Sequence, residues 1–190
     1  MDKFRERFYQ LSDDLLNEVE NSFKLWRYKK NTLVNKGSIA DRLFFINEGF
    51  ALLKIDFKGK QWVRHIAQPG EFITSFASFE NGICSEETIL AVGEFEIYYI
   101  ERNDLQKLRN KFPEVDKIYT SGITSALIAC QHRIEDLLCL DAEQYYEKLL
   151  NEKNAIMNNL PQYELASYLG IQPQSLSRIR GGTRRISSHM

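Results

Sequence analysis

The chain has 190 residues, of which 43% are hydrophobic and 27% charged, and its formal net charge is −1. This length allows one domain of ordinary size or two small ones. The apolar content is enough for a packed core and excludes wholesale disorder. Because the total charge gives no sign of a polyanionic partner, the distribution of charge along the chain is more informative than its sum.

The sequence contains no apolar run long enough to span a membrane, and its start lacks the apolar segment of a secretory signal. We therefore expect a cytoplasmic protein with no membrane partner. Cys84, Cys130 and Cys139 are scattered and have no CxxC spacing. Such a pattern is a poor disulfide framework, so we expect these cysteines to have a structural or incidental role and assign no metal site.

The first predicted element is an amphipathic helix that follows Ser12, a favoured N-cap residue. From Leu25 to Ile100 the sequence pattern changes to short apolar and aromatic runs separated by glycines. A spacing of roughly 10 to 12 residues between turn signals is typical of an all-β sandwich or barrel. The clearest hairpin pairs residues 51–56 with 61–66, because Gly59 lies where the turn must close. The β region is predicted to end near residue 101.

A long helix is predicted after Pro113, since proline is favoured at the first helical position. Along it, apolar residues recur at alternating steps of four and three, which is the heptad seam of a helix that pairs with another helix. The seam residues are Ile123, Leu127, Cys130, Ile134 and Leu137. A second stripe, which includes Ala126 and Ala129, widens the apolar face. The pattern alone leaves open whether this face packs against the β region or pairs with a second helix.

Asp141 and Gln144 have the spacing of a capping box, so a new helix and a new domain are predicted to begin near residues 138–141. Further on, residues 162–180 have the layout of two short helices joined at Gly170, and Pro173 opens the second helix. Only residues 151–160 separate the two parts, which is short for a two-stranded wing. The expected arrangement is a wingless pair of helices.

The second of these helices carries the side chains that suit DNA recognition. No Asp or Glu follows Glu164, so the end of the chain is basic. Glutamine can pair with adenine and arginine with guanine in a major groove. The candidate base readers are Gln172, Gln174, Ser175, Ser177 and Arg178, whereas Arg180 and Arg184 are expected to hold phosphates. The alternative interpretation is an ordinary helical hairpin with a solvated polar face.

Nearly the whole chain resembles the Crp/Fnr family of transcription regulators. The resemblance is carried by Lys36-Gly37 with residues 43–49, by Gln68-Pro69-Gly70-Glu71-Phe72-Ile73, and by residues 165–171 with 176–180. It implies an α+β fold with an N-terminal double-stranded β-roll, a cyclic-nucleotide-binding-like jelly roll, then a long dimerisation helix and a C-terminal helix-turn-helix. The expected boundaries are 1–111, 112–140 and 141–190. It also implies a homodimer on a near-palindromic site in double-stranded DNA, with RNA polymerase as a further candidate partner.

The sequence departs from the family pattern in the expected effector pocket, which we place at Gly70, Glu71, Phe72, Ser75, Ser85 and Glu86. Family members that bind cyclic nucleotides have an arginine near the position of Ser85, and Glu86 and Glu87 would instead repel a phosphate. We therefore expect an unidentified small-molecule effector other than cyclic AMP. No cofactor is assigned, and an iron-sulfur cluster is not expected because no cysteine precedes Cys84.

Two alternatives belong to other classes of protein. A metal-dependent enzyme on a β-barrel would need clustered ligands, but His65, His132 and His189 fall on separate predicted elements. No catalytic motif is present either, so we expect no enzymatic activity. The second alternative is a degenerate cyclic-nucleotide-binding-like protein that acts through protein partners, using aromatic strands around Trp62 and Tyr98.

Overall fold

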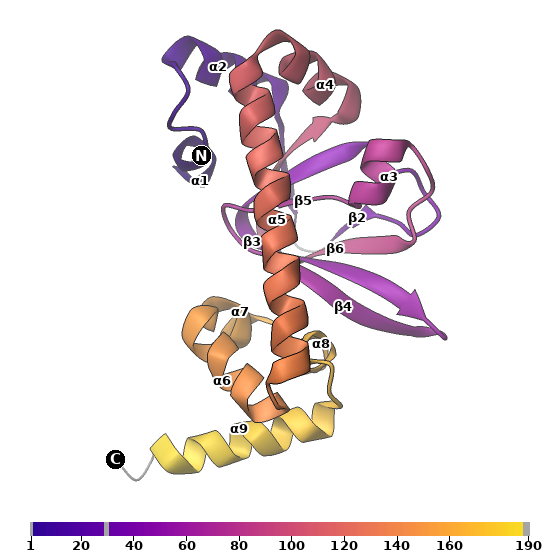
Figure 1. Cartoon of the computed structure of the whole chain (residues 1–190), viewed down its shortest axis with the longest axis vertical. Helices are drawn as coiled ribbons and strands as arrows, with labels where there is room; N and C mark the ends of the chain where they lie inside the picture. The colour runs from indigo at the N-terminus through magenta and orange to yellow at the C-terminus, as the bar shows by residue number, and fades with distance from the viewer. Residues whose placement is uncertain (1, 29–30, 188–190) are drawn as a thin grey trace.

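The structure is a computed structural model that describes residues 2–28 and 31–187. Its N-terminal half consists of short helices and an antiparallel sheet (Figure 1). These elements are α1 (Asp2–Arg7), α2 (Asp13–Ser22), β1 (Lys24–Tyr28), β2 (Asn31–Val34), β3 (Arg42–Phe57), β4 (Lys60–Ala67), β5 (Phe72–Ile73), α3 (Phe76–Asn81) and β6 (Glu87–Glu101). The C-terminal half is helical. Its elements are α4 (Arg102–Lys111), α5 (Pro113–Cys139), α6 (Ala142–Glu152), α7 (Asn154–Asn159), α8 (Gln162–Leu169) and α9 (Pro173–Ser187).

The sheet has the order β1-β6-β3-β4, with β2 paired to β6 and β5 paired to β3. The long strands β3 and β6 shift register on either side of Glu48, and such bulges bend a strand. Gly49 lies at this bend with φ +83°, and a Cβ atom there would lie 2.7 Å from the carbonyl oxygen of Glu94. Glycine is therefore required where the two strands curve around the core.

The predicted hairpin is confirmed, with Asp56 opposite Gln61 and Phe57 opposite Lys60. Its two turn residues, Lys58 and Gly59, both have positive φ, at 53° and 74°. Two positive φ values in a two-residue loop are those of a type I′ turn, whose twist matches that of the strands. The glycine therefore has the role that the sequence indicated.

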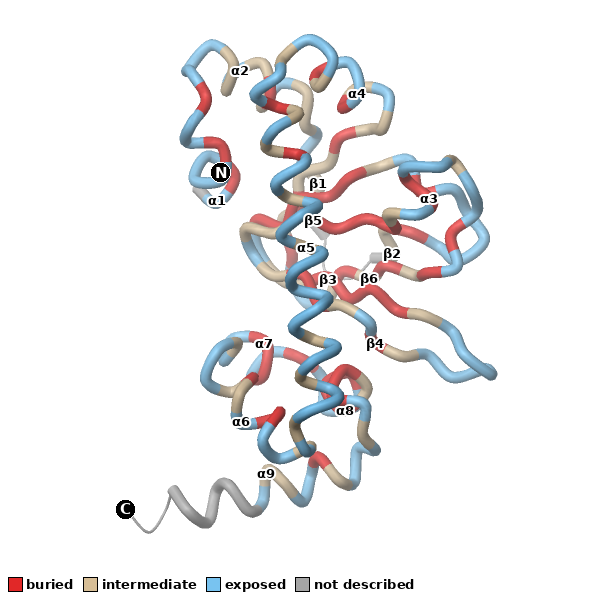
Figure 2. Tube along the Cα trace, in the orientation of Figure 1, coloured by how far each residue is buried: buried red, intermediate tan, exposed pale blue. Residues whose placement is uncertain are grey.

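Helix α5 runs along the whole molecule, from the N-terminal helices to the C-terminal ones (Figure 1). It begins at Pro113 in the first helical position, as predicted. Its first turns pack on the β-roll core through Val115 and Tyr119, whereas most of the rest is exposed (Figure 2). The predicted α+β fold, a β-roll followed by a long helix and C-terminal helices, is confirmed.

The C-terminal helices share a hydrophobic core with one side of the β-roll. Leu52 and Val63 of the sheet are buried together with Tyr145, Leu165 and Leu176. The capping box that begins α6 is present, with the Asp141 carboxylate accepting from the backbone N–H groups of Glu143 and Gln144. Helix α7 occupies the short connection where a wing would lie, so this connection is helical.

Candidate functional site: the α8–α9 pair, its docking surface and a cavity beside α5

The predicted pair of C-terminal helices is present as α8 and α9. Gly170 ends α8 with φ +72°, a left-handed conformation that favours glycine. Leu165, Ala166, Leu169 and Leu176 are buried between the helices and the rest of the domain. These contacts leave the outer face of α9 free to meet another molecule.

The candidate base readers lie at the start of α9. Gln172, Gln174, Ser177 and Arg178 are exposed, and Ser175 is half-buried. The Arg178 guanidinium lies 3.4 Å from the Ser175 hydroxyl, so these two side chains occupy one patch. The exposed set presents amide, hydroxyl and guanidinium groups without a carboxylate, which suits contact with base edges and phosphates.

The two candidate phosphate contacts differ in their surroundings. Arg180 donates a hydrogen bond of 2.9 Å to the carbonyl oxygen of Met157 and is half-buried. This internal contact ties α9 to α7, and a phosphate contact by Arg180 stays a prediction. Arg184 belongs to α9, but its side chain lies outside the described residues.

A buried ion pair joins α8 to the β-roll. Lys54 of β3 and Glu164 of α8 lie 2.5 Å apart, and their side chains are only 8% and 7% exposed. Nearby, the Ser167 hydroxyl accepts a hydrogen bond of 2.9 Å from the backbone N–H of Val63 on β4. The α8–α9 pair is therefore docked on the edge of the sheet by specific polar contacts.

Arg133 of α5 also connects the β-roll to α8. Its guanidinium donates to the carbonyl oxygens of Val63 and Tyr168, at 3.3 and 2.9 Å, and stacks over the Tyr168 ring at 4.1 Å. One side chain thus touches β4 and α8 together. We refer to Lys54, Val63, Arg133, Glu164 and Ser167 as the docking surface.

The predicted seam on α5 is exposed. The exposed fractions of Ile123, Leu127, Ile134 and Leu137 are 37%, 60%, 56% and 45%, and Cys130 is exposed as well. Leu137 also lies close to the α8–α9 turn, since a Cβ atom on Gly170 would be 3.8 Å from its Cδ2 atom. A row of apolar side chains of this length is unusual on a monomer surface.

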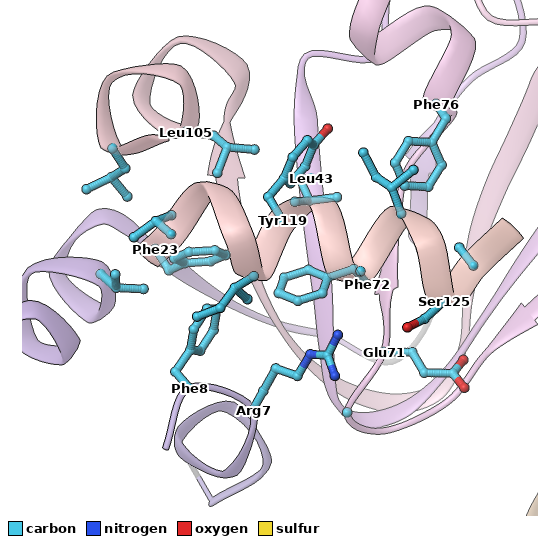
Figure 3. A pocket seen from close by; sticks show the side chains of 18 of the residues that line it. Arg7, Phe8, Phe23, Leu43, Glu71, Phe72, Phe76, Leu105, Tyr119 and Ser125 are labelled. Atoms are coloured by element: carbon cyan, nitrogen blue, oxygen red, sulfur yellow. The ribbon is translucent and has the colours of Figure 1, made fainter. Parts of the chain in front are cut away.

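A cavity of about 290 Å³ lies between α5, the N-terminal helices and the β-roll. Figure 3 shows apolar side chains such as Phe8, Phe23 and Leu105 at one end and the Glu71 carboxylate at the other. Burial raises the pKa of Glu71. The pKa of His65 is lowered to about 4, first by burial and then by the positive charges of Lys153, Arg64 and Arg133.

Among the predicted effector residues, Gly70, Glu71 and Phe72 line this cavity, whereas Ser75, Ser85 and Glu86 do not. The Ser85 hydroxyl is buried and donates to the Ser75 hydroxyl at 2.8 Å, so these two serines satisfy one another. The Glu86 side chain is 87% exposed and lies 3.9 Å from Lys36. The predicted pocket residues are thus split among the cavity (Gly70, Glu71 and Phe72), a closed polar contact (Ser75 and Ser85) and the exposed surface (Glu86).

The described residues contain neither a metal-binding cluster nor a membrane-spanning helix. Within 2–28 and 31–187, no group of three or more His, Cys, Asp and Glu side chains could hold a metal ion. His189 lies outside this described part of the chain. In the same ranges, no helix is both long and apolar enough to cross a membrane.

The β-roll and the flanking helices can be compared with known proteins. Residues 26–112 match the cyclic nucleotide-binding domain family. A search of curated proteins returned no significant match.

Solved structures with the same fold include FixK2 from Bradyrhizobium japonicum, with a TM-score of 0.76 and 14% identity over 87% of this chain and 86% of that chain. The c-di-GMP-responsive global regulator CLP from Xanthomonas campestris has a TM-score of 0.70 and 14% identity, over 93% of each chain. A protein described as a Crp/Fnr-family transcriptional regulator from Eubacterium rectale gives 0.69 and 13%, over 93% of this chain and 85% of that chain. At these identities the likeness establishes the fold alone.

Residues 70–87 of the β-roll supply no cation to a cyclic phosphate. A cyclic phosphate is an anion and requires a cation or several free donors. Residues 70–87 contain no lysine or arginine. The Ser75 and Ser85 hydroxyls are already paired, and Glu87 is buried beside Arg64, 2.5 Å away. This segment therefore offers a cyclic phosphate neither a cation nor a free hydroxyl from Ser75 or Ser85.

Three parts of the site were not predicted from the sequence: the ion pair Lys54–Glu164, the Arg133 contacts and the contribution of Arg7 to the cavity. A lysine within the apolar run 51–55 was a usable signal for the ion pair, because a charge in a buried strand needs a partner. The partner itself could not be identified, since it is 110 residues away.

Proposed function

We propose that the chain is a homodimeric, sequence-specific DNA-binding transcription regulator whose β-roll senses a small molecule other than cyclic AMP. The observation that carries this proposal is the exposed face of α9, where Gln172, Gln174, Ser177 and Arg178 form a patch without a carboxylate. The likeness of the fold to a protein described as a Crp/Fnr-family regulator supports it. The proposed units are 1–111, 112–140 and 141–190.

The exposed seam on α5 supports the dimer in this proposal. Pairing two copies through Ile123, Leu127, Cys130, Ile134 and Leu137 would remove these apolar side chains from water. Two α9 helices related by a two-fold axis would then meet half-sites about 34 Å apart. The operator should therefore be near-palindromic.

Selection of bound sequences from a random DNA pool at physiological salt tests the proposal. We expect a near-palindromic winner whose affinity falls steeply with salt, because arginine contacts release counterions from phosphates. Failure to enrich any sequence, with and without the candidate ligands described below, would contradict it. Co-purification of a protein partner in that case would favour the alternative of a sensor that acts through proteins.

A further inference from the structure

The cavity beside α5 owes its existence to small residues on that helix. Gly122, Ser125, Ala126 and Ala129 all face it, opposite the larger Phe72 and Phe76. Because none of the four carries a long side chain, the space between helix and sheet stays open. Its volume of about 290 Å³ lies near the lower end of the range for small-molecule sites, ~300–1,000 Å³.

One half of this cavity is lined by apolar side chains. The α5 stretch from Val115 to Gly122 lines it together with Phe8, Phe23 and Leu105, and these three side chains lie at one end of the cavity in Figure 3. This stretch covers two turns of helix, or roughly 10 Å. An apolar chain of moderate length would be removed from water along it, and such burial is favourable at ~25 cal/mol per Å².

A single cation lies beside the apolar half. Arg7 lines the cavity, and its Nη2 atom is 3.8 Å from the position that a Cβ atom of Gly122 would occupy. Within residues 2–28 and 31–187 the Arg7 side chain forms no ion pair and no hydrogen bond, whereas Arg5 on the same helix pairs with Glu20 at 2.7 Å. Arg7 is therefore available to an anion.

The neighbouring carboxylate does not neutralise Arg7. Glu71 accepts hydrogen bonds from the backbone N–H and the side-chain amide of Gln68, each 3.2 Å long. In Figure 3 its carboxylate points away from the Arg7 guanidinium. The polar end of the cavity and the free cation are thus separate features.

We propose that this cavity binds an amphiphile with one extended apolar chain and one anionic head, a carboxylate or a phosphate monoester, whose head contacts Arg7. The chain lies between α2, α4 and α5. Binding itself is independent of DNA, and only the role of this ligand as the effector rests on the proposed function. Ile123 lines the cavity and belongs to the α5 seam, so the ligand would touch the helix that pairs two copies.

Calorimetric titration of the full chain with decanoic acid, decyl phosphate, decan-1-ol and decylamine, each below its micellar concentration or solubility limit, tests the proposal. We expect saturable 1:1 binding of the acid or the phosphate, at least tenfold tighter than binding of the amine. The better of the two anions identifies the head group. Arg7→Gln should weaken binding of that anion at least tenfold and leave binding of the alcohol unchanged.

Two matched controls separate the site from general effects. Lys3→Gln removes a positive charge from α1 away from the cavity and should leave all affinities unchanged. Ala126→Phe fills the cavity and should abolish binding of every probe, whereas Ala155→Phe, at an exposed position of α7, should not. Circular dichroism checks that each variant is folded. If Ala126→Phe does not fold, Arg7→Gln alone decides the outcome.

Equal binding of the amine and the acid, an unchanged affinity in Arg7→Gln, or the absence of saturable binding would overturn the proposal. These titrations contain no DNA. If the protein binds the amphiphile but selects no DNA, the proposed site stands and the proposed regulator function is wrong. If it selects DNA but binds no amphiphile, the regulator function stands and the proposed site is wrong.

Discussion

Replacing Lys54 with methionine removes the cation of the buried Lys54–Glu164 pair and keeps a side chain of similar length. At an effective dielectric constant of about 20, unit charges 2.5 Å apart attract by about 7 kcal/mol. This attraction roughly offsets the several kcal/mol that each ion loses on leaving water. In Lys54→Met the Glu164 carboxylate stays desolvated without its partner, so we expect the free energy of unfolding to fall by about 3 to 5 kcal/mol.

Urea unfolding followed by circular dichroism measures this loss. Glu164→Met should cost a similar amount for the same reason. The double variant should lie close to the wild type or above it, because two apolar side chains can replace a buried pair without loss. Lys107→Met is the matched control, since the Lys107–Asp104 pair is exposed and its removal should leave the free energy of unfolding almost unchanged.

A small and additive loss of stability in the two single variants would contradict the buried ion pair. If Lys54→Met and Glu164→Met each cost less than about 1 kcal/mol and their effects add in the double variant, the two side chains do not form a buried pair in solution. The α8–α9 pair would then not be docked on the sheet edge through this contact. Faster hydrogen exchange at the α8 amides would also indicate that α8 is not held against the sheet.

Three further predictions concern dimerisation, DNA reading and pH. Ile134→Glu should dissociate the dimer by placing a charge in the apolar seam, whereas Ile128→Glu, on the same helix but outside the seam, should not. A two-chain mass for Ile134→Glu in dilute light scattering would contradict pairing through the seam. Arg178→Ala should weaken binding to the selected DNA site by about 1 to 3 kcal/mol, with Lys107→Ala as the unaffected control, and equal affinity would exclude a reading role. Because the pKa of His65 is lowered from 6.5 to about 4, its contribution to stability should be complete above pH 6.5 and decrease from there toward pH 4, by at most about 3 kcal/mol. Urea titrations at pH 7 and 4.5 should show a smaller difference in the free energy of unfolding between the two pH values for His65→Gln than for the wild type. Equal differences in the two proteins would rule this out.

Local signals in the sequence predicted the elements well. Gly59 in a two-residue turn, Pro113 at a first helical position and the Asp141 capping box each act on the backbone of their immediate neighbours. Such effects depend on only a few residues, so they can be recognised without the rest of the chain. The same holds for Gly170 between α8 and α9.

Features that depend on distant segments could not be predicted in this way. The cavity is formed by side chains from α1 to α5, and Arg7 enters it only because the fold brings α1 against Gly122. Ala126 and Ala129 were noted as part of an apolar stripe, but the space that they leave depends on the aromatic residues opposite them. The hydrogen bond from Arg180 to the Met157 carbonyl oxygen likewise depends on the position of α7, 23 residues earlier in the chain.

Helix α5 links the cavity to the α8–α9 turn as one continuous element. It has 27 residues, with its proline in the first turn, so it spans about 40 Å without a break. Val115 and Ala129 face the cavity, and Leu137 lies against Gly170. A small axial rotation imposed at the cavity would be carried along α5 to the turn, because the helix is continuous between them. Two distant sites would then be coupled by the stiffness of a single helix, with no relay of side chains between them.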